Sequence, residues 1–344
     1  MKNNTLLTAN IDKTDINILA LLHQNSRIPL TEIGAKVDLS KDGVLYRINK
    51  LVEKGIIKKF FIDVDYKLLN FSKYILFIRF SDISPQKLEE ISAQIQNIHE
   101  IIFSASCIGY WDIWLEILAD SFARFNEVMD QIFGRFGTNI KDYHLLVISE
   151  EHKLYDPLLE SEDYGILSIP QKEKKPRYKK QEFEQLSNTP LKINVIDYKI
   201  LKSLENDSRK SYVDIAKETG IALDTVKYRV KKLVETKLIM HFDLVLDYNK
   251  LGHNLDVVLF KFSKYTKDVS AKFISYLNAN KNVRAAVSVI GKQEIMAEVL
   301  THNREEYLNF INQIRSQFSD IFSGYTEIRV VSDIKDVTLP YIKL

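Results

Sequence analysis

Apolar residues recur at helical spacing near the start of the chain and outline three short helices. Ser40 is suited to cap the third helix, and Gly55 is suited to the left-handed conformation after its end. Residues 56–64, IIKKFFIDV, predict a strand, a turn and a second strand, which together form a wing. Residues 12–66 are therefore predicted to form a winged helix-turn-helix. The apolar stripes are Ile18, Leu19 and Leu22, then Leu30, Ile33 and Val37, then Val44, Ile48, Leu51 and Val52.

Residues 67–155 alternate between strand and helix patterns. Strand-like runs occupy residues 74–80, 101–108, 113–118 and 143–149. Helical stripes fall between them at Leu88, Ile91 and Ile95, and at Phe122, Phe125, Met129, Ile132 and Phe136. The order βαββαβ predicts a ferredoxin-like α/β sandwich with both helices on one face of its sheet. The other face is apolar and needs a partner, and the simplest partner is a sister domain in the same chain.

The whole pattern occurs twice, and Asp15 in the first copy matches Asp197 in the second. One register, without a gap, continues to Gly109 and Gly291. The second copy is predicted to hold a winged helix-turn-helix over residues 191–248 and a sandwich over residues 249–344. The predicted fold class is α+β, with two tandem copies of one two-domain unit. The densest match pairs Val44, Tyr46, Arg47, Lys50, Leu51, Val52 and Glu53 with Val226, Tyr228, Arg229, Lys232, Leu233, Val234 and Glu235.

Residues 156–190 separate the copies and lack a sustained helical period. The segment contains four prolines and the run QKEKKPRYKK, so we interpret it as a solvated linker. The alternative is that its basic residues contact DNA phosphates. These residues are Lys172, Lys174, Lys175, Arg177, Lys179 and Lys180.

Composition narrows the class of protein. The 344 residues are 45% hydrophobic and 27% charged, with a formal net charge of +2. The single cysteine, Cys107, excludes an internal disulfide, and the chain has no CxxC or CxxH cluster for zinc. We expect no metal and no cofactor. No apolar run is long enough for a signal peptide or a membrane span, which predicts a cytoplasmic protein without a membrane partner.

The third helix of each copy carries the candidate chemistry. Once its buried stripe is assigned, basic, aromatic and amide side chains remain on the open face, and such groups bind phosphates and base edges of double-stranded DNA. The alternatives are a solvated helix and a protein-binding winged helix. The predicted DNA-binding residues are Lys41, Tyr46, Arg47, Asn49 and Lys50 in copy one, and Thr225, Lys227, Tyr228, Arg229, Lys231 and Lys232 in copy two.

The two copies differ at the ends of this helix. Ala222 replaces Ser40, and Lys237 replaces Gly55. Loss of an N-cap oxygen costs about 1 kcal/mol. We therefore expect the second recognition helix to begin later, with Asp224 as its cap, or to fray.

Several motifs together resemble the leucine-responsive (Lrp/AsnC) regulators. They are Asp-x-x-Ile-Leu at the head of the first helix, Ser-Arg before the second, Val-x-x-Arg-(Ile/Val)-x-x-Leu in the third, and Gly-x-x-Asp in the sandwich. The resemblance covers both copies. It implies a transcriptional regulator that dimerises through its amino-acid-sensing (RAM) domains, often assembles further, and places two recognition helices in successive major grooves. Here one chain would form the pseudo-dimer.

The resemblance also implies that small effectors, often amino acids, bind near the Gly-x-x-Asp turn. By position this assigns Gly109 and Asp112, with Tyr110 and Trp111 either lining a pocket or packing in the core. In copy two the motif retains Gly291 but has Glu294 instead of Asp, which puts that site in doubt.

Two other functions remain open. Siroheme decarboxylases resemble the same family, but they carry His and Arg near this turn, where this chain has SASCIGYWDIWLEI. The sequence also lacks GxSxG, P-loop, GxGxxG and HExxH motifs. We therefore expect no enzyme and no catalytic residues. The third possibility is an effector sensor or assembly protein without DNA binding.

Overall fold

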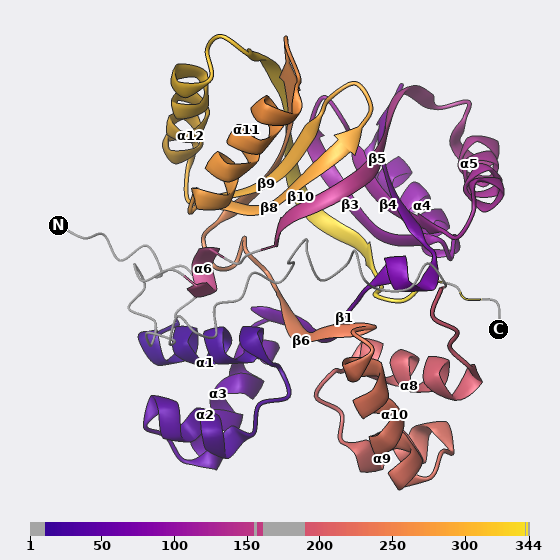
Figure 1. Cartoon of the computed structure of the whole chain (residues 1–344), viewed down its shortest axis with the longest axis vertical. Helices are drawn as coiled ribbons and strands as arrows, with labels where there is room; N and C mark the ends of the chain where they lie inside the picture. Colours follow the sequence, from indigo (N-terminus) through magenta and orange to yellow (C-terminus); the bar gives the residue numbers. More distant parts are fainter. Residues whose placement is uncertain (1–10, 155–156, 161–189, 341, 343–344) are drawn as a thin grey trace.

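The fold comes from a computed structural model that describes residues 11–154, 157–160, 190–340 and 342. A β-barrel flanked by helices forms one half of the molecule, and two helical units lie side by side on the same side of that barrel (Figure 1). Within the described ranges, no helix is long and apolar enough to cross a membrane.

Each helical unit contains three helices, as the sequence predicts. Their ranges are α1 (Lys13–Gln24), α2 (Leu30–Val37) and α3 (Lys41–Glu53) in copy one, and α8 (Val195–Asn206), α9 (Tyr212–Thr219) and α10 (Leu223–Glu235) in copy two. Most residues of the predicted apolar stripes face inward, with Val44 and Ile48 buried in one unit and Val226 and Val230 in the other. Val52, which was assigned to the stripe of α3, is instead 43% exposed.

The prediction of a hairpin wing is wrong. The segment forms one strand, β1 (Ile57–Val64), and its counterpart is β6 (Ile239–Leu246). The two pair antiparallel with each other, with Phe60 opposite Leu244. No Gly, Pro or Asn interrupts β1, so the chain continues straight and its hydrogen-bonding groups are satisfied by the other copy. The resulting β1–β6 ribbon joins the two helical units.

Each α/β domain has the predicted order βαββαβ. Copy one consists of β2 (Ser72–Phe80), α4 (Pro85–Gln96), β3 (Ile101–Gly109), β4 (Ile113–Ala119), α5 (Phe122–Phe136) and β5 (Ile140–Leu154). Copy two consists of β7 (Asn254–Phe262), α11 (Lys267–Ala279), β8 (Val283–Ile290), β9 (Ile295–Thr301), α12 (Arg304–Gln317) and β10 (Phe322–Asp336). A short 3-10 helix, η2 (Tyr66–Leu69), precedes β2.

The two sheets close into one barrel with the order β10-β3-β4-β2-β5-β8-β9-β7. The last strand of each copy pairs with the other copy, β5 with β8 and β10 with β3. The sheet faces without helices line the interior, where Phe77 and Trp114 of copy one pack with Leu259 and Met296 of copy two. The expected pairing of the two sandwich domains within one chain is therefore confirmed.

The first described part of the predicted linker is helical. Residues Pro157–Glu160 form the short helix α6, and Leu158 and Leu159 are buried in the core that includes α1. The six basic residues proposed as phosphate contacts, between 172 and 180, lie outside the described residues.

Candidate nucleic-acid interface

The open face of α3 matches the prediction from the helical pattern. Lys41, Tyr46, Asn49 and Lys50 are exposed, while Arg47 is half-buried. Tyr46 leaves 64% of its surface accessible. The Lys50 ammonium lies 5.5 Å from the centre of the Tyr46 ring, so the two side chains form one cationic and aromatic surface.

The open face of α10 has a similar arrangement. Lys227, Tyr228, Lys231 and Lys232 are exposed, whereas Thr225 and Arg229 are half-buried. Tyr228, the counterpart of Tyr46, is 62% exposed. Lys227 pairs with Asp224 at 3.4 Å and Lys231 pairs with Glu235 at 3.7 Å. Ion pairs this exposed contribute little to stability, so both lysines can exchange a carboxylate for a phosphate.

The predicted arginines bind carboxylates of their own units. Arg47 Nη1 lies 2.8 Å from both Asp12 and Asp15, which form the capping box of α1. Burial alone would raise the pKa of Asp12, but hydrogen bonds from Arg47 and from backbone amides lower it. Arg229 contacts Asp197 at 3.4 Å. Asn194 occupies the position of Asp12 in copy two, so Arg229 has one carboxylate partner fewer than Arg47.

The helix ends agree with the sequence in part. Ser40 accepts a hydrogen bond from the Gly43 amide at 3.1 Å, as expected of an N-cap. Ala222 makes no side-chain cap, yet α10 begins at Leu223, the position equivalent to the start of α3. The expectation that α10 begins later is therefore wrong, because burial of its apolar stripe outweighs one missing cap.

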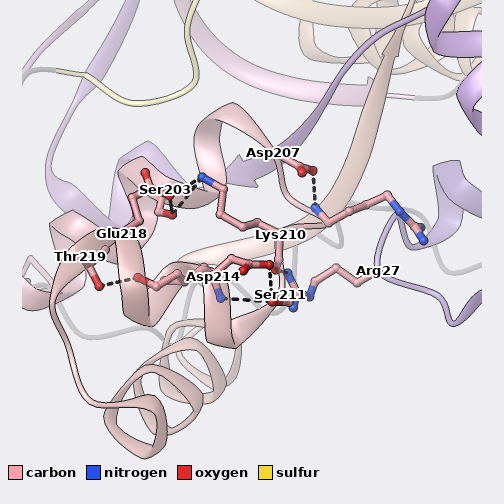
Figure 2. Close-up of polar contacts among 10 residues, drawn as sticks. Arg27, Ser203, Asp207, Lys210, Ser211, Asp214, Glu218 and Thr219 are labelled. Carbon is pink, nitrogen blue, oxygen red and sulfur yellow. Dashed lines mark hydrogen bonds and ion pairs between the residues drawn. The ribbon is translucent and has the colours of Figure 1, made fainter.

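Reciprocal contacts hold the two helical units together, and Figure 2 shows Arg27 of copy one beside Lys210 at the α8–α9 connection. Arg27 Nη1 donates to the carbonyls of Ser208 and Lys210 at 2.7 and 2.9 Å. Its guanidinium also lies 4.7 Å from the centre of the Tyr212 ring. Its counterpart Arg209 donates to the Ser26 carbonyl. Because each copy binds backbone of the other, the two recognition helices keep one relative orientation.

The predicted effector turns have a structural role in both copies. Asp112 accepts a hydrogen bond from the Phe80 amide at 2.7 Å, and Glu294 accepts one from the Phe262 amide at 3.2 Å. The longer Glu side chain thus keeps the contact made by Asp. Gly109 has a φ of 135°, and a Cβ there would lie 3.0 Å from the Glu327 carbonyl oxygen of β10. Gly291 similarly packs closely against β5.

The aromatic pair at the first turn divides between surface and core. Tyr110 is half-exposed and donates to Asp142 at 3.0 Å, whereas Trp111 is buried in the barrel. The Trp111 ring stacks on His144 of β5 with centroids 5.9 Å apart. The sequence gives no signal for His144 at this turn, because only the pairing of β5 with β2 brings it there. Burial, followed by the Lys292 charge, lowers the pKa of His144.

Polar atoms near these turns lack partners among the described residues. They are Trp111 Nε1, His144 Nε2 and Gln293 Oε1, the last on the residue equivalent to Trp111. Across the same part of the chain, no group of three His, Cys, Asp or Glu side chains is placed to hold a metal ion.

Comparisons with known proteins match each copy separately and the whole chain together. A winged helix-turn-helix DNA-binding family model matches residues 11–58 and 193–240. The chain is 32% identical over 124 residues to the HTH-type transcriptional regulator LysM of Sulfurisphaera tokodaii, covering 36% of this chain and 86% of the relative. It is 33% identical over 134 residues to LysM of Saccharolobus solfataricus, covering 38% of this chain and 92% of the relative.

A solved structure covers both copies. The siroheme decarboxylase NirDL superposes with a TM-score of 0.62 at 15% identity, covering 96% of this chain and 95% of that chain. This likeness shows a common fold for the tandem arrangement. The relatives that match one unit almost completely show that the chain belongs to the Lrp/AsnC family, and the two family-model matches show that the unit occurs twice in tandem.

Proposed function

We propose that the protein is a sequence-specific DNA-binding transcriptional regulator in which one chain provides both reading heads. The observation that carries this proposal is the pair of exposed, basic and aromatic recognition-helix faces. They belong to units that lie on the same side of the barrel and are joined by the β1–β6 ribbon (Figure 1). A fixed pair of such helices suits two major-groove half-sites about one helical turn apart.

The charge on these faces makes the proposal testable with mixed-sequence DNA. Binding of the full chain to a fluorescent duplex is followed by anisotropy at low ionic strength and through a salt titration. Affinity should fall steeply as salt rises, because phosphate-bound counterions are released on binding. Lys50→Ala and Lys232→Ala should each reduce the salt slope by about 1. Lys87→Ala, which changes a half-exposed lysine on α4, is the matched control. Absence of salt-dependent binding overturns the proposal.

An effector that modulates DNA binding is part of the same proposal. The Trp111, His144 and Gln293 side chains present polar atoms beside the two turns that have no partner within the described part of the chain. A small amino acid offers donors and acceptors that such groups can bind. The DNA titration is therefore repeated with an amino-acid mixture. A changed affinity supports an effector, and an unchanged affinity limits the proposal to DNA binding alone.

A second candidate, an enzyme acting on a siroheme-like tetrapyrrole, is favoured by the full-length likeness to NirDL. A cleft of about 1230 Å³ between η2, β5 and α11 offers room for such a ligand, since it exceeds the roughly 300–1,000 Å³ of usual small-molecule sites. Lys67, Lys73 and Lys267 line this cleft and can bind ligand carboxylates, but Asp63, Asp65, Glu150 and Glu151 line it as well, so its charge alone does not select an anionic ligand. Titration with an iron-free siroheme derivative separates the candidates. A saturable shift of its absorption spectrum favours the enzyme, and an unchanged spectrum favours the regulator.

A further inference from the structure

A second, smaller cavity lies where the barrel meets the β1–β6 ribbon, and it shares Lys73 and Glu151 with the larger cleft described above. Its volume is about 310 Å³, which is within the range of small-ligand sites. Both copies contribute to its wall, including Phe61 of β1, Leu246 of β6, and the strands β3, β4, β8, β9 and β10. We call it the ribbon cavity.

Two equivalent carboxylates, Glu116 and Glu298, line the ribbon cavity. Each has a cation partner, but the two cations occupy non-equivalent positions. Lys73 lies 3.6 Å from Glu116, and Arg284 binds Glu298. The counterpart of Lys73 is Leu255. The two copies therefore have equivalent acids at the cavity, but each acid is paired with a cation from a different position of the repeat.

The carboxylates that line the ribbon cavity outnumber the cations that pair with them. Glu151 also lines the cavity and lies 3.5 Å from Lys73, so three carboxylates share two cations. Burial raises the pKa of Glu116, and the nearby Glu298 and Glu151 charges raise it further, although Lys73 opposes them. A further positive charge would relieve this repulsion.

The two sides of the ribbon cavity differ in shape. Copy one presents Phe103 and Trp114, which pack edge to face with centroids 4.9 Å apart. Copy two has Ala285 and Met296 at the equivalent positions, which leaves space opposite the aromatic rings. Trp114 is 2% exposed, and its indole N–H has no partner among the described residues. Aromatic faces beside carboxylates are a recurrent environment for organic cations.

We infer that the ribbon cavity binds a small organic amine, with its ammonium group between Glu116 and Glu298 and its apolar body against Phe103 and Trp114. A free amino acid fits less well, because its carboxylate would add a fourth negative charge to this group. The inference goes beyond DNA binding and does not depend on it.

Three probes with one common body test the charge requirement: phenethylamine, phenylalanine and 3-phenylpropanoate. Binding to the full chain without DNA is measured by calorimetry and by the shift in melting temperature. Phenethylamine should bind and raise the melting temperature. The affinity for phenylalanine should be lower than that for phenethylamine by about tenfold or more, and 3-phenylpropanoate should not bind. Failure of phenethylamine to bind, or equal binding of all three probes, overturns the inference.

Variants then locate the site. Glu116→Gln and Glu298→Gln should each weaken phenethylamine binding about tenfold or more, because each removes a charge-assisted contact. Ala285→Phe keeps every charge and places in copy two the residue that copy one has, so it should abolish binding by filling the space. Glu127→Gln, an exposed carboxylate on α5, is the control. If binding to these three cavity variants, checked for folding by circular dichroism, equals that of the wild type, the inference is wrong.

Discussion

The hydroxyl oxygens of Ser26 and Ser208 lie 2.7 Å apart, although 182 positions separate the two residues in the chain. This separation equals the offset of the duplication, so each serine contacts its own counterpart. The surrounding bonds are reciprocal as well, because the Ser26 amide donates to the Phe242 carbonyl and the Ser208 amide donates to the Phe60 carbonyl. The pseudo-twofold axis of the helical units passes between these two hydroxyls.

A double-mutant cycle should measure this contact. Both serines are fully buried, so Ser26→Ala or Ser208→Ala leaves the other hydroxyl without its partner, at a cost of about 1–3 kcal/mol. The double variant should be less destabilised than the sum of the single variants, because it leaves no orphaned hydroxyl. Urea unfolding followed by circular dichroism gives the three free energies. Strict additivity would show that the two hydroxyls do not interact.

Lys237 should be replaceable with a gain in stability. Its φ is 61°, in the left-handed region, and its counterpart Gly55 has a φ of 64°. A side chain in this conformation costs about 1–2 kcal/mol, so Lys237→Gly should raise the free energy of unfolding by about 1 kcal/mol. Gly55→Ala is the matched reverse change and should lower it. Unfolding by urea checks both, and a loss of stability in Lys237→Gly would refute the strain argument.

The two arginines of the recognition helices should differ in role. Arg47 binds two carboxylates at 2.8 Å, whereas Arg229 has one at 3.4 Å. Arg47→Ala should therefore cost more stability, and Arg229→Ala should cost more DNA affinity, about 1–3 kcal/mol if Arg229 reads a base. Unfolding and anisotropy measurements on both variants give the order. The opposite order would contradict these assignments.

Cys107 offers a reporter of barrel opening. Its side chain lies in the barrel interior, and burial raises the pKa of the thiol to about 12. Because the thiolate is the reactive form, a disulfide-exchange reagent at pH 8 should label the native protein very slowly. Labelling should become complete in denaturant, and its rate should follow the free energy of unfolding. Immediate stoichiometric labelling of the native protein would place the thiol outside a closed barrel.

The sequence predicted the helices and strands better than it predicted which strands pair. Stripes such as Val44, Ile48 and Leu51 identified α3, because local periodicity reports burial. The same periodicity gave the order βαββαβ in both sandwiches. The β1–β6 ribbon was missed, because strand pairing between segments about 180 residues apart leaves no local signal. The wing hypothesis failed for this reason.

The candidate site shows the same limit. The exposed lysines and tyrosines followed from the helix face, but the carboxylate partners of Arg47 did not, since Asp12 and Asp15 lie more than thirty positions earlier. The equivalent hydrogen bonds that Asp112 and Glu294 accept from backbone amides could not be predicted either, because a turn motif does not show which amide its acid binds.

The central claim is that one chain carries two unlike DNA-reading heads in a fixed arrangement. Selection of bound duplexes from a random pool by the full chain tests it most directly. We predict an enriched site with two different half-sites, centred about 10 base pairs or a multiple of that spacing apart. A perfectly symmetric palindrome would contradict the difference between the heads, and the absence of any enriched sequence would contradict DNA reading itself.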